Sequence, residues 1–138
     1  MNCEYSNYSF QMVTNNKNPE KKDTPTEQQL FDVMNDIIDH RQLFCQPHFT
    51  RKDMLKLTGL DKNRFGNMMR RYSGVSNCTV YINAKRIQLA AQLIVERPDT
   101  PIKVIAIDCG MSNIITFNRL FKESFGMTPT QYRKQQTT

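Results

Sequence analysis

The sequence lacks a long apolar run. No stretch of about 18 apolar residues occurs in the chain, so no segment is expected to span a membrane. The opening residues, MNCEYSNYSF, contain neither the basic region nor the apolar region of a secretory signal. We therefore expect a cytoplasmic protein that makes no membrane contact of its own. Its 138 residues are enough for one domain with a core of modest size.

Clustered metal ligands are also missing. The four cysteines are widely spread, no CxxC pair occurs, and there are only two histidines. A zinc site needs ligands at short, regular spacings, so we expect no metal and no cofactor. The four cysteines would allow two disulfides, but reduced thiols in a cytosolic protein are the favoured interpretation.

Arrangements that support catalysis are scarce as well. His40 falls at the end of a helical pattern and His48 in a loop, so no Cys/His or Ser/His/Asp set is expected to come together. A methyl-accepting Cys78 near basic residues is the one enzymatic alternative, and it rests on position alone. We therefore predict that the protein is not an enzyme.

Acidic residues are outnumbered by basic ones. The chain has 19 Lys+Arg against 13 Asp+Glu, a formal net charge of +6. Residues 41–76 hold eight bases and two acids, whereas residues 26–40 hold four acids and no lysine or arginine. A basic balance favours polyanionic partners such as nucleic acid or an anionic membrane surface, although a basic stretch is often only a solvated face.

Alternation typical of β-strands is absent, whereas helical periodicity runs from residue 26 onward. We predict an all-α fold in which residues 1–25 form a flexible tail or linker and residues 26–138 form the domain. The region 41–49 reads as a loop. The expected helices cover 27–40, 51–58, 62–73, 79–96, a short segment from Pro101 to Cys109, 113–124, and a last short helix from Pro129 through Arg133.

Helix ends are expected where capping residues and glycines fall. The expected N-caps are Thr26, Thr50, Asp61, Thr100 and Ser112, and the expected stops are Gly59, Gly74, Gly110 and Gly126. Pro101 is expected in the first turn of its helix. Lys85 and Arg86 fall on the apolar side of helix 79–96, where they are expected to snorkel at its edge.

Two segments of the chain match each other. Each has a short helix, a glycine-bearing turn and a second helix, which reads KNRFGNMMRRYSG in one case and NIITFNRLFKESFG in the other. This order predicts two helix-turn-helix units, at about 50–74 and 100–126, joined by helix 79–96 and preceded by an extra helix, 27–40. The joining helix would be roughly 27 Å long, which suits major grooves that recur about every 34 Å.

Helical geometry separates an inner from an outer face on both second helices. The expected core faces are Phe65, Met68, Met69 and Tyr72 on one helix, and Phe117, Leu120, Phe121 and Ser124 on the other. Asn63, Asn67 and Arg70 fall on the opposite side of the first helix. On the second helix, apolar Ile115 falls among Arg119 and Lys122. Contact between Ile115 and a thymine methyl group would explain this mixture, and packing on another helix or on the tail is the alternative.

The second half of the chain resembles the DNA-binding domain of AraC/XylS transcription regulators, and the resemblance covers about residues 50–134. The strongest matches are Ile102, Ile105-Ala106, Gly110-Met111, Ser112, Thr116-Phe117-Asn118-Arg119, Phe121-Lys122, Gly126-Met127-Thr128-Pro129 and Tyr132-Arg133. The resemblance implies a transcription regulator; activation is the expected mode, and the choice between activation and repression stays open. Its helices 62–73 and 113–124 would enter consecutive major grooves of double-stranded DNA. RNA polymerase is a further candidate partner, and the oligomeric state stays open.

Carried over residue by residue, the resemblance also implies the reading positions. The base-reading residues are expected to be Asn63, Arg64, Asn67, Ile115, Thr116, Asn118 and Arg119, with Ile114 half buried. Two residues depart from the family pattern. Gly66 has no side chain to offer at a reading position, and Leu55 stands where a small residue is usual.

Contacts to the DNA backbone complete the expected site. The expected phosphate-contacting residues are Thr50, Arg70, Arg71, Ser112 and Lys122. For Thr50 and Ser112 the alternative is plain capping, and for the cations it is a solvated surface. The alternative for the whole protein is a helical module that binds a protein partner through the basic face of residues 62–71.

Overall fold

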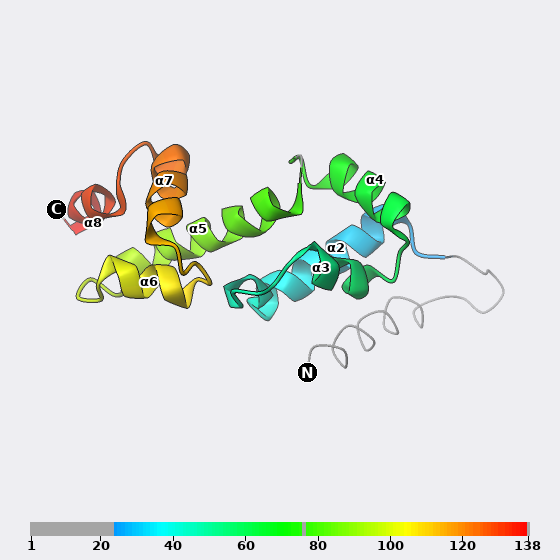
Figure 1. Ribbon diagram of the computed structural model, residues 1–138, viewed down its shortest axis with the longest axis horizontal. Helices are drawn as coiled ribbons and strands as arrows, with labels where there is room; N and C mark the ends of the chain where they lie inside the picture. The colour runs from blue at the N-terminus through cyan, green and yellow to red at the C-terminus, as the bar shows by residue number, and fades with distance from the viewer. Residues whose placement is uncertain (1–23, 76, 138) are drawn as a thin grey trace. The chain divides into compact units, whose positions relative to one another are not determined.

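The computed structural model of the protein describes residues 24–75 and 77–137, so most of the tail expected over residues 1–25 lies outside the described residues. Within those residues all regular structure is helical (Figure 1), which confirms the predicted all-α class. The elements are α2 Glu27–His40, the 3-10 turn η1 Leu43–Cys45, α3 Arg51–Thr58, α4 Lys62–Tyr72, α5 Cys78–Glu96, α6 Ile102–Asp108, α7 Ile114–Phe125 and α8 Pro129–Thr137. The turn η1 lies in the region that was expected to be a loop.

The helices divide between two compact units. The first contains α2, α3, α4 and α5 as far as Tyr81, and the second contains residues 44–49 and the chain from Ile82 onward. The long helix α5 therefore contributes residues to both units.

In the first unit, α2 packs against both α3 and α4 (Figure 1). The buried residues are Leu30, Phe31, Met34 and Ile38 of α2, Met54 and Leu57 of α3, and Phe65, Met68 and Met69 of α4. The three residues of α4 are buried as predicted, whereas Tyr72 is only half buried. The ring of Phe31 lies 6.0 Å from that of Tyr72 and 6.2 Å from that of Tyr81. Burial of this apolar face fixes which side of α4 remains in solvent.

In the second unit, α5, α6 and α7 share one core. Ile87, Ala90, Ile94, Ile105, Ala106, Cys109, Phe117 and Phe121 are buried in it, and Phe125 and Tyr132 pack against its edge. Ser124 was expected on the core face, and that prediction is wrong because its side chain is exposed. The buried stripe follows Phe117, Phe121 and Phe125 instead, since Tyr132 of α8 packs 5.4 Å from the Phe121 ring and 5.2 Å from the Phe125 ring.

Arg86 differs from its prediction. It does not snorkel at the edge of α5, because its relative exposure is only 8%. Its Nε donates to the carbonyl of Phe44 at 2.6 Å, and its Nη2 donates to the carbonyl of Gln46 at 2.9 Å. The pKa of the guanidinium is lowered by burial, yet a guanidinium keeps its proton in proteins. Arg86 therefore ties the segment after α2 to the second unit.

The turn between α6 and α7 passes against that same segment. Gly110 has φ +100°, and a Cβ at this position would lie 2.7 Å from the carbonyl oxygen of Phe44 and 2.8 Å from that of Cys45. Both the backbone angle and the close approach require glycine here. The predicted stop at Gly110 thus has a second cause, which is packing against a distant part of the chain.

Most predicted helix starts are confirmed. The Thr26 side chain accepts a hydrogen bond from the backbone N–H of Gln29 at 3.1 Å, and the Asp61 side chain accepts one from the N–H of Arg64 at 2.9 Å. At Thr50, the Asp53 carboxylate accepts from the backbone N–H of Thr50 at 2.9 Å. These contacts satisfy N–H groups that a helix leaves without an internal partner.

Two predicted caps are wrong by one residue. Helix α6 begins after Pro101, whose carbonyl accepts from Val104 and Ile105, so Thr100 is not its cap. Helix α7 begins after Asn113, whose side chain accepts from the N–H of Thr116 at 3.1 Å, so Ser112 is not its cap. Serine and asparagine cap helices equally well, so the sequence did not distinguish between the two neighbours.

Candidate nucleic-acid interface

The outer face of α4 carries the residues predicted for DNA contact in the first unit. Its position follows from the preceding turn, because Gly59 adopts a left-handed backbone with φ +67° and Asp61 then starts α4. The predicted residues Asn63, Arg64, Asn67, Arg70 and Arg71 are all exposed. Of these, Asn63, Asn67 and Arg70 lie opposite the buried Phe65 and Met68.

The residues of this face make two different kinds of side-chain contact. The side chain of Asn67 accepts a hydrogen bond from the guanidinium of Arg70, so these two predicted residues act together. Arg64 instead lies 3.8 Å from the carboxylate of Glu27 on α2. Because the side chain of Arg64 is 58% exposed, this ion pair contributes little to stability and can be exchanged for another anion.

The outer face of α7 carries the predicted residues of the second unit. Ile115 has a relative exposure of 78%, so none of the described helices covers it and the alternative of helix packing is wrong within the described residues. Ile114 is half buried, as expected, and Thr116 is also half buried. Asn118, Arg119 and Lys122 are exposed beside Ile115 on this helix.

Arg119 on α7 forms only a weak, exposed ion pair within its own helix. Arg119 pairs with Glu123 one helical turn later at 3.1 Å, and the two side chains are 60% and 59% exposed. An exposed pair of this type stabilises a helix by about 0.3–0.5 kcal/mol. A bidentate contact between arginine and guanine is worth about 1–3 kcal/mol in discrimination between bases, so the ion pair is easily exchanged.

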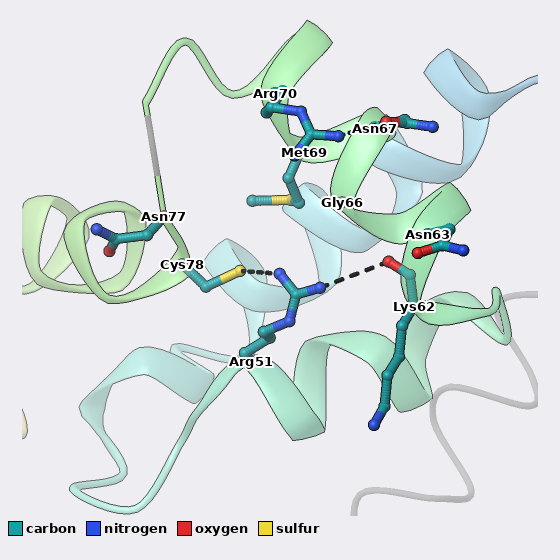
Figure 2. Close-up of a pocket in the computed structure, with 9 residues that line it drawn as sticks. All are labelled: Arg51, Lys62, Asn63, Gly66, Asn67, Met69, Arg70, Asn77 and Cys78. Carbon is teal, nitrogen blue, oxygen red and sulfur yellow. Dashed lines mark hydrogen bonds between the residues drawn. The ribbon is translucent and has the colours of Figure 1, made fainter.

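A pocket of about 520 Å³ lies beside α4 in the first unit (Figure 2). It is lined by Arg51, Lys62, Asn63, Gly66, Asn67, Met69, Arg70, Asn77 and Cys78. Three predicted residues, Asn63, Asn67 and Arg70, therefore come together here with residues that the sequence reasoning missed. Among the missed residues, Arg51 had one signal in the sequence: it follows the cap Thr50 within the basic stretch 41–76.

Arg51 is held over the core of the first unit. Its guanidinium carbon lies 4.9 Å from the centre of the Phe65 ring. Two further contacts are long: 3.9 Å from Nη1 to Cys78 Sγ and 3.5 Å from Nη2 to the carbonyl of Lys62. Stacking of the cation on an aromatic ring therefore orients the side chain, and a stronger acceptor can replace the two long hydrogen bonds.

Cys78 has the properties of a structural thiol. It is 4% exposed, and its burial raises the pKa of the thiol, although Arg51 partly offsets this effect. A raised pKa keeps the group protonated, and the thiolate is the nucleophilic form. Methyl transfer to Cys78 is therefore disfavoured.

Sites of other classes have little support in the described part of the chain. No group of three or more His, Cys, Asp and Glu residues there is arranged to hold a metal ion. Among the same residues, no helix combines the length and the hydropathy needed to cross a membrane. The exposed faces of α4 and α7 are thus the candidate site.

Comparison with known proteins identifies the family of the chain. A family model described as "Helix-turn-helix domain" matches residues 54–135, more than half of the chain. The probable transcription factor PqrA of Proteus vulgaris is 29% identical over 110 residues, covering 76% of this chain and 86% of PqrA. The RCS-specific HTH-type transcriptional activator RclR of Escherichia coli is 29% identical over 87 residues, covering 63% of this chain and 30% of RclR.

A shorter but closer match is the probable transcriptional regulator LumQ of Photobacterium leiognathi, 42% identical over 53 residues, or 38% of this chain and 21% of LumQ. The chain thus spans less than a third of LumQ and RclR. Among solved structures, the C-terminal domain of AraT, a response regulator from Geobacillus stearothermophilus, shares the fold with a TM-score of 0.64 at 20% identity. That match covers 83% of this chain and 88% of the other. The chain belongs to the AraC-type helix-turn-helix family of DNA-binding transcription regulators.

Proposed function

We propose that the protein binds a bipartite DNA sequence by inserting α4 and α7 into consecutive major grooves. The observation that carries the proposal is the exposure of Ile115, 78%, on a helix whose opposite face is buried through Phe117 and Phe121. An isolated exposed isoleucine is normal, but here it lies among Asn118 and Arg119. The major groove offers apolar thymine methyl groups next to hydrogen-bonding base edges, and this mixed face suits it.

The proposed base readers follow from the chemistry of their side chains. Arg119 suits the O6 and N7 acceptors of guanine, and Asn67 suits the N6 and N7 groups of adenine. Ile115 would contact a thymine methyl group. Asn63, Arg64, Thr116 and Asn118 complete the set of proposed base contacts.

The backbone contacts set orientation and salt dependence. Arg70, Arg71 and Lys122 are exposed cations, and each phosphate that they neutralise steepens the fall of log K with log salt by about 0.9. Thr50 and Ser112 precede helices α3 and α7, where backbone N–H groups can bind phosphate. Since Asn113 caps α7, the Ser112 hydroxyl is available for such a contact.

The regulatory role is a further part of the proposal. RclR is described as a transcriptional activator, and we propose activation for this protein too, in the cytoplasm and with RNA polymerase as the partner on DNA. The rival function, a module that binds a protein through the face 62–71, would show no steep dependence on salt for duplex DNA.

Selection of binding sites from random duplexes tests the proposal. We expect two short motifs separated by about one helical turn, with the α7 motif the sharper because α4 carries Gly66 at a reading position. One uninterrupted motif would contradict the bipartite model, and no enrichment at all would contradict sequence-specific binding.

Two alanine variants test the assigned roles. Arg119→Ala should relax base preference at one motif by about 1–3 kcal/mol, whereas Arg70→Ala should weaken binding to all sequences alike. Lys134→Ala removes the same charge from an exposed position on α8 and serves as the matched control. Equal losses on every sequence for both Arg119→Ala and Arg70→Ala would contradict the separation of roles.

A further inference from the structure

Gly66 lines the α4 pocket, and two guanidinium groups approach it. A Cβ built at Gly66 would lie 3.8 Å from Nη2 of Arg51 and 3.9 Å from Nη1 of Arg70. Figure 2 shows the two arginines entering from different elements, Arg51 from α3 and Arg70 from the next turn of α4. The space that a side chain at position 66 would fill is therefore bounded by two cations.

No carboxylate neutralises this pair within the described residues. The contacts of Arg51 are to Cys78, to the Lys62 carbonyl and to the Phe65 ring. Arg70 contacts the neutral amide of Asn67. Two like charges beside one small space repel each other, so an anion placed between them would be favoured.

The rest of the lining is suited to an oxyanion. Besides the arginines, the pocket exposes the neutral amides of Asn63, Asn67 and Asn77. Cys78 is the first residue of the 19-residue helix α5, and a helix N-terminus carries a positive partial charge. The amino group of Lys62 points away from Arg51 in Figure 2, so the arginines are the principal cations of the pocket.

We propose that this pocket binds a backbone phosphate of DNA, with Arg51 and Arg70 as its ligands and Gly66 as the residue that leaves it room. The inference rests on the proposed function, because it requires the outer face of α4 to lie against DNA. Guanidinium groups bind phosphate through paired hydrogen bonds. Stacking on Phe65 holds Arg51 in place before binding, which reduces the ordering that the contact requires. Gly66 thus has a role in backbone binding instead of base reading.

Two variants test the phosphate pocket, and two more serve for comparison. Arg51→Gln removes a cation and keeps a polar, although shorter, side chain. Gly66→Glu places a carboxylate between the arginines, where it competes with phosphate. Gly66→Ala is an uncharged comparison for Gly66→Glu, because its Cβ would make only ordinary van der Waals contact with both arginines. Lys134→Gln controls for loss of one positive charge elsewhere.

The readout is the affinity for the selected duplex as a function of salt. Arg51→Gln and Gly66→Glu should each reduce the magnitude of the slope of log K against log salt by about 0.9, with the ranking of sequences unchanged. Lys134→Gln should keep both the slope and the affinity within about twofold, and Gly66→Ala, which adds no charge, should lose less affinity than Gly66→Glu. Helical circular dichroism establishes that each variant is folded, and the two test variants act by different routes, so loss of one to misfolding leaves the other informative.

A second measurement distinguishes the source of the phosphate. The amide resonance of Gly66 is followed by NMR while either the selected duplex or inorganic phosphate is added. A shift with DNA supports a backbone phosphate, and a shift with millimolar inorganic phosphate as well supports the same oxyanion chemistry with a free source. No shift with either addition would overturn the phosphate pocket but not the proposed function. Unchanged affinity and slope in both test variants would do the same. Failure of the unmodified protein to bind any selected duplex would overturn the proposed function instead.

Discussion

Ile115 is the most exposed of the large apolar side chains in the described part of the chain, at 78%, and the next, Ile107, is 54% exposed. Removing such a side chain deletes almost no packing, so its cost to stability is small. Any large effect of a change at Ile115 must therefore come from a partner. This property makes Ile115 a clean probe of the proposed DNA interface.

Ile115→Ala should weaken binding to the selected site by about 0.8 kcal/mol for each methyl or methylene group that no longer touches the DNA, while the free energy of unfolding changes by less than about 0.5 kcal/mol. Replacing the contacted thymine by deoxyuridine removes the methyl group from the DNA side. The unmodified protein should lose affinity for this duplex, and Ile115→Ala should lose almost nothing further. Additive losses in this double-mutant cycle would contradict a contact between Ile115 and the methyl group.

Arg86 is the opposite case, a charged side chain whose importance lies inside the protein. We expect Arg86→Met to lower the free energy of unfolding by about 2–3 kcal/mol, because the carbonyls of Phe44 and Gln46 lose charged donors at 2.6 and 2.9 Å. Chemical denaturation measures the change. Lys103→Met, at an exposed position on α6, is the control and should stay within about 0.5 kcal/mol. An equal effect of the two substitutions would show that the buried hydrogen bonds contribute nothing.

At the start of helix α7, the residue that caps the helix differs from the residue that is proposed to contact DNA. Its cap is Asn113, whose side chain accepts from Thr116 at 3.1 Å, whereas the neighbouring Ser112 is exposed and outside the helix. The helix start therefore offers two adjacent polar side chains with different expected roles. Sequence reasoning had assigned both roles to Ser112.

Asn113→Ala should lower the free energy of unfolding by about 1 kcal/mol. Ser112→Ala should change it by less than about 0.5 kcal/mol but should weaken DNA binding if its hydroxyl contacts a phosphate. Thermal unfolding and DNA titration of the two variants form a matched pair. A larger loss of stability for Ser112→Ala than for Asn113→Ala would contradict the observed cap.

The buried and exposed faces of α4 and α7 were predictable because the spacing of residues along a helix fixes the side on which each side chain lies. Phe65, Met68, Phe117 and Phe121 recur at three- and four-residue intervals and are all buried as expected, which leaves the predicted polar residues on the other side. Ser124 failed this reasoning because Tyr132 of α8 packs against Phe121 and Phe125 and leaves Ser124 exposed. No local pattern in α7 carries that information.

For the molecule as a whole, the net charge of +6 is the property that most affects binding. If Arg70, Arg71 and Lys122 each neutralise one phosphate, the slope of log K against log salt should be roughly −2.7, and affinity should fall about 40-fold between 50 and 200 mM salt. The phosphate proposed for Arg51 would steepen this slope further. Fluorescence anisotropy with a labelled duplex measures it.

The control for this prediction is stability over the same salt range, which should change little because the ion pairs Arg64–Glu27 and Arg119–Glu123 are exposed. Binding that does not weaken with salt would contradict phosphate contacts, and it would favour a protein partner for the face of α4.

The sequence by itself determined the all-helical class, the two repeated helix-turn-helix patterns and the inner and outer faces of their second helices. These features depend on residues a few positions apart, so local spacing encodes them. Only the tertiary structure placed Arg51 beside Gly66 and Arg70, and buried Arg86 against the carbonyls of Phe44 and Gln46. Arg51 lies 15 positions before Gly66 in the chain, and Arg86 lies 42 positions after Phe44. Helix packing decides which of these distant side chains meet, and the periodicity of the sequence does not record it.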